Sequence, residues 1–109
     1  MVNVKNNRIT MTRGDTCRIK ISLADDAGGE YIAQEGDEIR FAAKKTYSDP
    51  EPLIFKTVPH DTMTLEIAPE DTKPLEFGTY VYDIQITFAD GTVNTFVTKA
   101  QLKIEEEVD

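Results

Sequence analysis

The chain is short of the residues on which reactive or disulfide-held proteins depend. Its 109 residues include no tryptophan, one cysteine (Cys17) and one histidine (His60). A lone cysteine cannot close an intramolecular disulfide, so the fold must be held by packing, and an oxidising compartment is not required. No stretch approaches the roughly 18 apolar residues of a membrane span, and the first ten residues lack the apolar segment of a secretion signal. We expect a protein that is neither bound to a membrane nor secreted by a signal peptide.

Positive charge is also scarce. Acidic residues number 20 against 12 basic ones, which gives a formal net charge of −8 at pH 7. A surplus of this kind repels nucleic-acid phosphates and anionic lipid alike. Lys44 and Lys45 next to Tyr47 form a basic and aromatic cluster that is too small to reverse this. We therefore expect no nucleic-acid partner.

Groups for catalysis are few. His60 is followed by Asp61, and the only two serines, Ser22 and Ser48, lie in other segments. A nucleophile needs a base, and the base needs an orienting group, whereas neighbours in sequence usually point apart. Cys17 falls on the face of a strand that we expect to be buried, where a thiol is inert. We predict no enzymatic activity, no cofactor and no small-molecule substrate.

Acidic loops leave one metal site as an open alternative. Calcium takes six to eight oxygen ligands, and loops at the end of a β-sandwich can supply them. Neither acidic loop has the spacing of an EF-hand, so solvated turn residues are the favoured interpretation, with calcium binding as the alternative. The carboxylates concerned are Asp25, Asp26, Glu30, Glu35, Asp37 and Glu38.

Apolar residues recur with a period of two over most of the chain, as in strands with one buried face. The pattern is strongest over residues 17–23, 38–44, 62–67 and 79–88, and weaker over residues 8–11, 53–57 and 94–104. Turn-forming clusters interrupt the windows in which a helix would need to form. About seven short strands predict an all-β fold, an immunoglobulin-like antiparallel β-sandwich without a disulfide, as a single domain over residues 1–109.

A corner between two strands is predicted at residues 69–74, which begin and end with proline and suit one helical turn. Gly78 then starts a new strand. In immunoglobulin-like sandwiches a tyrosine at the start of such a strand sends its hydroxyl back to the preceding loop, and Tyr80 is placed to do so. Tyr82 stands where antibody domains have a cysteine, and Phe41 must fill the volume of their usual tryptophan.

The last hairpin turns at Asp90 and Gly91. A two-residue turn there would bury polar side chains of the final strand. A three-residue loop over 89–91, with Gly91 left-handed in a bulge, keeps the apolar residues on one face. This loop pairs Ile84 with Phe96 and Tyr80 with Ala100.

These features together resemble small immunoglobulin-like proteins and modules of tailed bacteriophages and prophages. The resemblance is carried by "GDT" at residues 14–16, by "PEDTKPLEFGTYVYDIQ" at residues 69–85, and by the hairpin at Asp90 and Gly91. It implies a non-enzymatic virion component of tail or baseplate type, made in the cytoplasm of the bacterial host. Such a subunit would act through protein–protein contacts with other phage structural proteins, as a homo-oligomer in the assembly.

The tripeptide Arg13-Gly14-Asp15 matches a cell-adhesion ligand. Integrin ligands present it at the tip of a mobile loop, whereas here it directly precedes an alternating strand. Gly14 suits an unusual φ and Asp15 suits a cap, so we interpret the tripeptide as a turn.

The C-terminal "EEEVD", residues 105–109, resembles a chaperone tail and is interpreted as a solvated acidic tail.

Two further hypotheses concern binding. Residues 1–7 contain alternating Val2 and Val4, and they are either an added strand or an arm that pairs with the edge of a neighbouring copy. The alternative function is a stand-alone glycan- or peptide-binding module, which would need an exposed aromatic platform. The candidates for that platform are Tyr31, Tyr47 and Phe55.

Overall fold

The computed structural model describes residues 8–24 and 29–106, and their regular structure is mostly β-strand, as predicted. The strands are β1 (Ile9–Thr12), β2 (Cys17–Lys20), β3 (Leu23–Ala24), β4 (Glu30–Tyr31), β5 (Glu38–Lys44), β6 (Ile54–Val58), β7 (Thr64–Ile67), β8 (Gly78–Thr87) and β9 (Val93–Glu105). The helix in these ranges is α1 (Pro69–Thr72), and none in the described residues is long and apolar enough to cross a membrane. The predictions for residues 1–7 and for 107–109 of the acidic tail lie outside the described residues.

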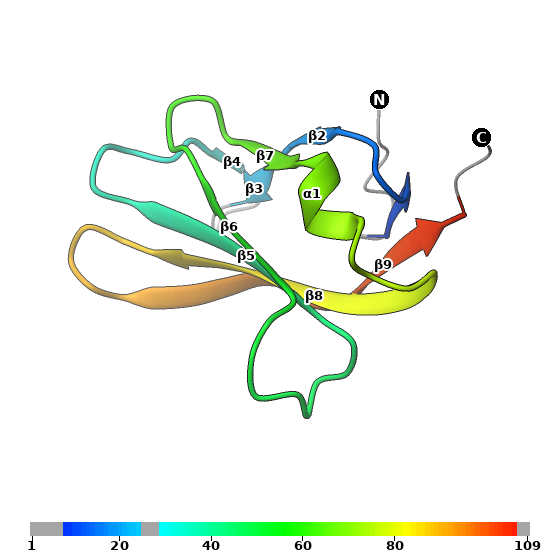
Figure 1. The fold of residues 1–109 in the computed structure, drawn as a ribbon. Coiled ribbons are helices and arrows are strands. Elements are labelled where there is room, and N and C mark those ends of the chain that lie inside the picture. The colour runs from blue at the N-terminus through cyan, green and yellow to red at the C-terminus, as the bar shows by residue number, and fades with distance from the viewer. Residues whose placement is uncertain (1–7, 25–28, 107–109) are drawn as a thin grey trace.

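Five strands form one mixed sheet in the order β1-β9-β8-β5-β6, and two further ladders, β2–β7 and β3–β4, are antiparallel. Figure 1 shows β2, β7 and α1 on one side of the sheet, whereas the connection between β5 and β6, residues 45–53, projects on the opposite side. The prediction of a wholly antiparallel scaffold is wrong at β1, which runs parallel to β9 with Ile9 opposite Leu102. Alternation predicts which face of a strand is buried but not its direction.

One core joins the sheet to the β2–β7 ladder. In β5, Ile39, Phe41 and Ala43 are buried, while the residues between them point outward. The same alternation buries Cys17 and Ile19 of β2. All of these side chains belong to a single buried cluster. The period-two pattern of the sequence therefore identified the core-facing residues correctly.

The described ranges contain nine strand segments rather than about seven. The alternation over residues 17–23 predicts one strand, but the structure divides it into β2 and β3. The segment that contains β4 is rich in aspartate and glycine, which predict a turn. Because β3 and β4 pair through only two residues each, this ladder has too little alternation to be detected from sequence.

The helical turn predicted at residues 69–74 is present as α1. Pro69 occupies its first turn, where the missing N–H costs no hydrogen bond. The Asp71 carboxylate accepts a hydrogen bond from the Ala68 N–H at 2.7 Å, and it forms an ion pair with the Lys56 ammonium, also at 2.7 Å. Asp71 thus ties the start of α1 to strand β6.

The predicted contact of Tyr80 is also present. β8 begins at Gly78, whose φ of +141° favours glycine, and the Tyr80 hydroxyl donates a hydrogen bond to the Glu76 carbonyl at 2.7 Å. Tyr82 is buried against Phe41, with ring centroids 5.1 Å apart. These two rings occupy the centre of the core, where the sequence predicts that Phe41 replaces a tryptophan.

The Arg13-Gly14-Asp15 turn is tied to α1 and to the segment that follows it. Gly14 has φ +84°, and its N–H donates to the Thr72 hydroxyl of α1 at 2.8 Å. The Arg13 guanidinium lies 4.5 Å from the centre of the Phe77 ring. The turn is capped by Thr72 rather than by Asp15, whose side chain is exposed, so the predicted role of Asp15 is corrected. An Arg13 engaged in this way is unlike the free tip of an adhesion loop.

The final hairpin has the predicted loop but not the predicted pairs. The Phe88 N–H donates to the Thr92 carbonyl at 2.8 Å across residues 89–91, and Gly91 has φ +90°. Asp90 accepts a hydrogen bond from the Thr92 N–H at 2.9 Å. Two register shifts, each of which adds one residue to β9, then place Ile84 opposite Val97 and Tyr80 opposite Leu102, rather than Phe96 and Ala100. Two shifts together restore the alternation, so Ala100 and Leu102 still face the core.

Candidate functional site

Large apolar side chains are exposed on the outer face of the sheet, next to its β6 edge. Tyr47, Leu53 and Phe55 are 46%, 51% and 56% exposed, and we name them the outer-face cluster. Phe55 lies opposite Ala42 of β5, and Leu53, just before β6, donates its backbone N–H to the Ala43 carbonyl at 2.8 Å. The cluster therefore follows the base of the loop that projects from the sheet in Figure 1.

A small pocket of about 100 Å³ lies beside this cluster. Ala42 and Val81 contribute apolar lining, while Lys44 and Asp83 supply one charge of each sign, and Tyr47 closes it from the loop. Burial, and then the nearby charge of Asp83, raise the pKa of Tyr47. Tyr47 therefore keeps its proton at neutral pH and offers a flat ring with a hydrogen-bonding tip.

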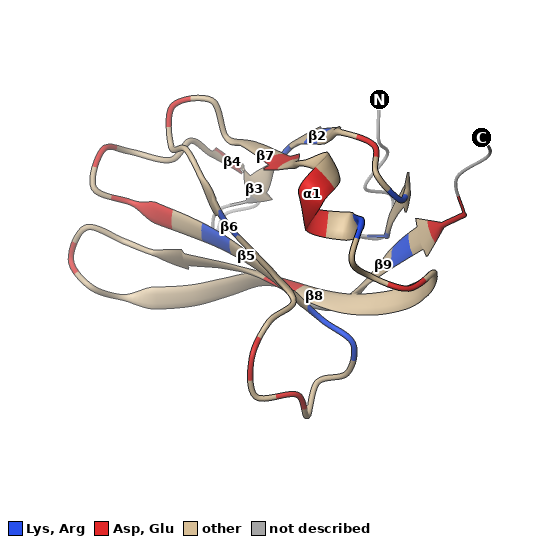
Figure 2. Cartoon of the chain, viewed as in Figure 1, with Lys and Arg blue, Asp and Glu red and all other residues tan. Residues whose placement is uncertain are grey.

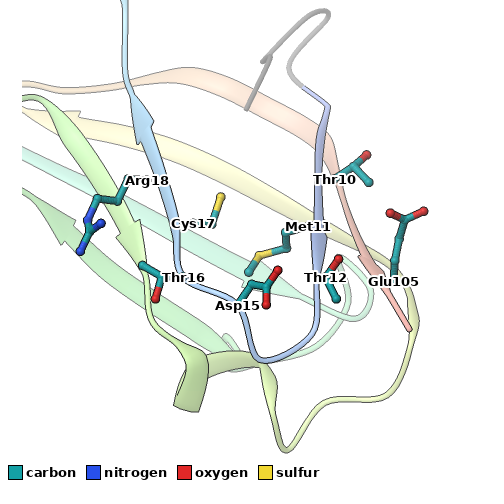
Figure 3. A pocket seen from close by; sticks show the side chains of 8 residues that line it. All are labelled: Thr10, Met11, Thr12, Asp15, Thr16, Cys17, Arg18 and Glu105. Carbon is teal, nitrogen blue, oxygen red and sulfur yellow. The ribbon is translucent and has the colours of Figure 1, made fainter. Parts of the chain in front are cut away.

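A larger and more open hollow of about 420 Å³ lies between β1 and β2 (Figure 3), and we name it the edge hollow. Met11 of β1 and Cys17 of β2 point into the space between the strands and are both buried, so they form its floor. Cys17 is buried, as predicted, and burial raises the pKa of its thiol. The lining residues are Thr10, Met11, Thr12, Asp15, Thr16, Cys17, Arg18 and Glu105.

Both strands turn toward the edge hollow a backbone edge to which no described strand is paired. The Arg13 N–H donates to the Glu105 carbonyl of β9, so by alternation the N–H and C=O of Thr10 point away from β9. The Ile21 N–H donates to the Met63 carbonyl beside β7, so those of Arg18 and the other even-numbered residues of β2 point away from β7. The described part of the chain has no strand paired to either edge. Such edges are templates for an added strand.

Comparison with known proteins does not assign the chain to a family. The chain matches no protein-family model and no curated protein.

The structure brings together some of the residues singled out in the sequence and separates others. Tyr47 lines the same small pocket as Ala42, and Phe55 lies opposite Ala42 in the sheet. Tyr31, in contrast, packs edge-on against Phe88, with ring centroids 5.7 Å apart. The edge hollow has no signal in the sequence, because it depends on consecutive strands joining different ladders. His60 lies near Asp37, and the two serines lie on other segments.

The acidic residues do not converge in the described part of the chain. Figure 2 shows them distributed over loops, α1 and several strands, and no three metal-ligating side chains gather among the residues described. Asp37 is held by protein groups, since it accepts hydrogen bonds from the Tyr31 hydroxyl at 2.5 Å and from the backbone N–H groups of Gln34 and Ala89 at 2.9 and 3.3 Å. Asp25 and Asp26 lie outside the described residues.

Asp37 is expected to make stability depend on pH in the acid range. The hydrogen bond from the Gln34 N–H, followed by that from Tyr31, lowers the pKa of Asp37 below its usual 3.8. A lowered folded-state pKa stabilises the fold above the unfolded-state pKa, and this contribution is lost as pH falls through the folded-state value. We expect Asp37→Asn to lower the free energy of unfolding by about 1 kcal/mol at pH 7, because the carboxylate is only half buried, and by less at about pH 3.

Urea unfolding at both pH values measures this difference. Asp15→Asn, at an exposed turn carboxylate, is the matched control and should leave the stability nearly unchanged at either pH. A difference between wild type and Asp37→Asn that stays the same from pH 7 to pH 3 would contradict the assignment.

Proposed function

We propose that this chain is a non-enzymatic structural subunit of a phage or prophage particle, of tail or baseplate type, which acts through protein–protein contacts. The observation that carries the proposal is the outer-face cluster of Tyr47, Leu53 and Phe55, each about half exposed. Contiguous apolar side chains on a surface mark sites of association, because solvent exposure of such a group is unfavourable. Its partners would be other structural proteins of the particle and further copies of itself.

An immunoglobulin-like sandwich is the fold that we propose for this subunit. Three observations support it: the β2–β7 ladder faces a five-stranded sheet, the sheet has β1 as a parallel edge strand, and the Tyr80 hydroxyl bonds back to Glu76. The motifs at residues 14–16 and 69–85 support kinship with phage modules. Genes for tail or head completion next to the gene for this chain would add support. We propose that the subunit is made in the cytoplasm of the bacterial host and becomes part of the virion.

Self-association through the outer-face cluster is the first test. We expect light scattering to give a multiple of the 12.2 kDa chain mass at high concentration. The double variant Leu53→Ser/Phe55→Ser should shift the protein to monomer, because it removes the apolar contact without touching the core. Val93→Ser, at a residue 53% exposed outside the cluster, is the matched control and should associate like wild type. A wild-type monomer at every concentration, or equal association of both variants, would count against the proposal.

A glycan- or peptide-binding module is the second candidate, favoured by the pocket beside Tyr47. An exposed aromatic ring next to a paired positive and negative charge suits a sugar face or a short peptide. Binding on a glycan or peptide array that is lost on Tyr47→Ala but kept in Val93→Ser would favour this function. Without Tyr31, the proposed platform is reduced to Tyr47 and Phe55.

A further inference from the structure

Strand β6 forms the edge of the five-stranded sheet opposite to β1, and all 5 of its residues are described. The Leu53 N–H donates to the Ala43 carbonyl at 2.8 Å, so the backbone groups of Ala43 point toward β6. Ala43 lies opposite Ile54, and by alternation the even-numbered residues of β6 bond to β5. The N–H and C=O of Phe55 and Thr57 therefore point away from β5, and no described strand is paired to that side.

This edge lacks the features with which proteins protect exposed strands. Charged side chains, above all lysine, and proline prevent an edge from pairing with another chain. The one charged residue of β6 is Lys56, whose ammonium forms an ion pair with Asp71 of α1 at 2.7 Å and whose side chain is only 28% exposed. β6 contains no proline, and its Phe55 is 56% exposed. The edge is therefore open to a further strand.

We propose that β6 pairs with β6 of a second copy of the chain, antiparallel about a two-fold axis, with Phe55 opposite the partner's Phe55. This inference rests on the proposed function, because it names the contact through which the subunit associates with itself. The two-fold axis of an antiparallel strand pair is perpendicular to the sheet. The two sheets therefore continue as one, and the outer-face clusters of both copies lie on the same side of it.

The register follows from the residues along the edge. Hydrogen-bonded pairs must join odd-numbered residues, because only these have outward-pointing backbone groups. Phe55 opposite the partner's Phe55 exchanges two hydrogen bonds and pairs two exposed rings on the outer face, which is a favourable cross-strand contact. Phe55 opposite the partner's Thr57 would set Lys56 against the partner's Lys56, and like charges directly opposite are destabilising. Thr57 opposite the partner's Thr57 would set Phe55 against Pro59, which has no N–H.

A copy of this chain meets the requirements of the edge without any further feature. It brings an open strand of the same length, and it brings an exposed ring to the position opposite Phe55. Contacts about a two-fold axis are self-complementary in this way. One short strand on each side falls below the area of about 1,200 Å² at which specific, stable interfaces begin, so the dimer forms only at high protein concentration.

Thr57→Pro tests strand pairing without altering the outer-face cluster. Because the Thr57 N–H points away from β5, proline at this position costs no hydrogen bond within the sheet, but it blunts the edge. We expect light scattering to find Thr57→Pro monomeric at concentrations at which the wild type is a dimer. Thr57→Val keeps the N–H and is the matched control, which should dimerise like wild type.

The outcomes separate this inference from the proposed function. Equal association of Thr57→Pro and Thr57→Val, with loss of association in Leu53→Ser/Phe55→Ser, would overturn the strand pairing and leave the proposed function standing. A wild-type monomer at every concentration would count against both.

Hydrogen exchange in the wild-type chain keeps the test independent of any variant. We expect the Phe55 amide to exchange about tenfold more slowly in concentrated than in dilute protein, because pairing covers an edge amide that is otherwise open to water. The Lys56 amide points toward β5 and is the internal control, which should change far less. Exchange at Phe55 that does not depend on concentration, or that slows only as much as exchange at Lys56, would overturn the inference.

Discussion

Replacement of Phe41 by alanine is expected to lower the free energy of unfolding by about 4 kcal/mol, the middle of the range for a large aromatic residue in a core. Phe41 is fully buried in β5, and its ring packs against that of Tyr82. Alanine would leave a cavity between the sheet and the β2–β7 ladder, where neither layer can close on it. A domain of this size has a total stability of about 5–15 kcal/mol, so the variant would lose a large part of it.

Phe55→Ala provides a matched control for this change. Phe55 is the same residue type on the strand next to β5, but its side chain points outward and is 56% exposed. We expect it to change the stability by less than about 0.5 kcal/mol. Urea unfolding followed by tyrosine fluorescence measures both variants, since the chain has no tryptophan. If Phe41→Ala does not fold, Phe41→Leu should still show a loss of about 1 kcal/mol. Equal losses for Phe41→Ala and Phe55→Ala would refute the assignment of the core.

The strands that could be predicted are those in which burial alternates along a long segment. β5 runs from Glu38 to Lys44, as the pattern predicts. A strand with one face in solvent and the other in the core has alternating polar and apolar residues, so its sequence shows which face is buried. The strands β3 and β4 pair through only two residues each, which is too few for an alternating pattern. The parallel direction of β1 is set by its pairing with β9, which lies far away in the sequence, and local alternation does not encode this.

The register of β9 shows a similar limit. The loop at residues 89–91 follows from Gly91 and from the need to keep apolar residues on one face. The two shifts between Tyr82 and Gln85 each add one residue to β9, and together they return its apolar residues to the same face. The alternation of apolar residues therefore cannot reveal them. Parity predicts the buried residues of a strand more securely than it predicts their partners.

The candidate surfaces differ in the same way. Tyr47 and Phe55 can be suggested from sequence, because aromatic residues outside the alternating face of a strand are exposed. The position of both residues near Ala42 could not be predicted from sequence, since it requires the pairing of β5 with β6. The edge hollow could not be predicted either, because it exists only where β1 joins the five-stranded sheet and β2 joins β7.

Thr72→Val is expected to lower the free energy of unfolding by about 2 kcal/mol. Thr72 is the one polar residue among the described ones that is fully buried, and its hydroxyl accepts the hydrogen bond from the Gly14 N–H at 2.8 Å. Valine preserves the shape of the side chain, so the loss isolates the hydrogen bond. The Gly14 N–H would then remain partly buried without an acceptor, which costs more than the bond itself contributes.

Two readouts separate this effect from a general loss of packing. Thr79→Val, at an exposed threonine of β8, is the matched control and should change the stability by less than about 0.5 kcal/mol. In Thr72→Val, hydrogen exchange at the Gly14 amide should accelerate more than exchange in β8, because the Arg13-Gly14-Asp15 turn loses its tie to α1. That turn sets β1 against β2, so loosening it should also open the edge hollow that both strands line. A Thr72→Val variant as stable as Thr79→Val would mean that the turn is held by Arg13 and the backbone alone.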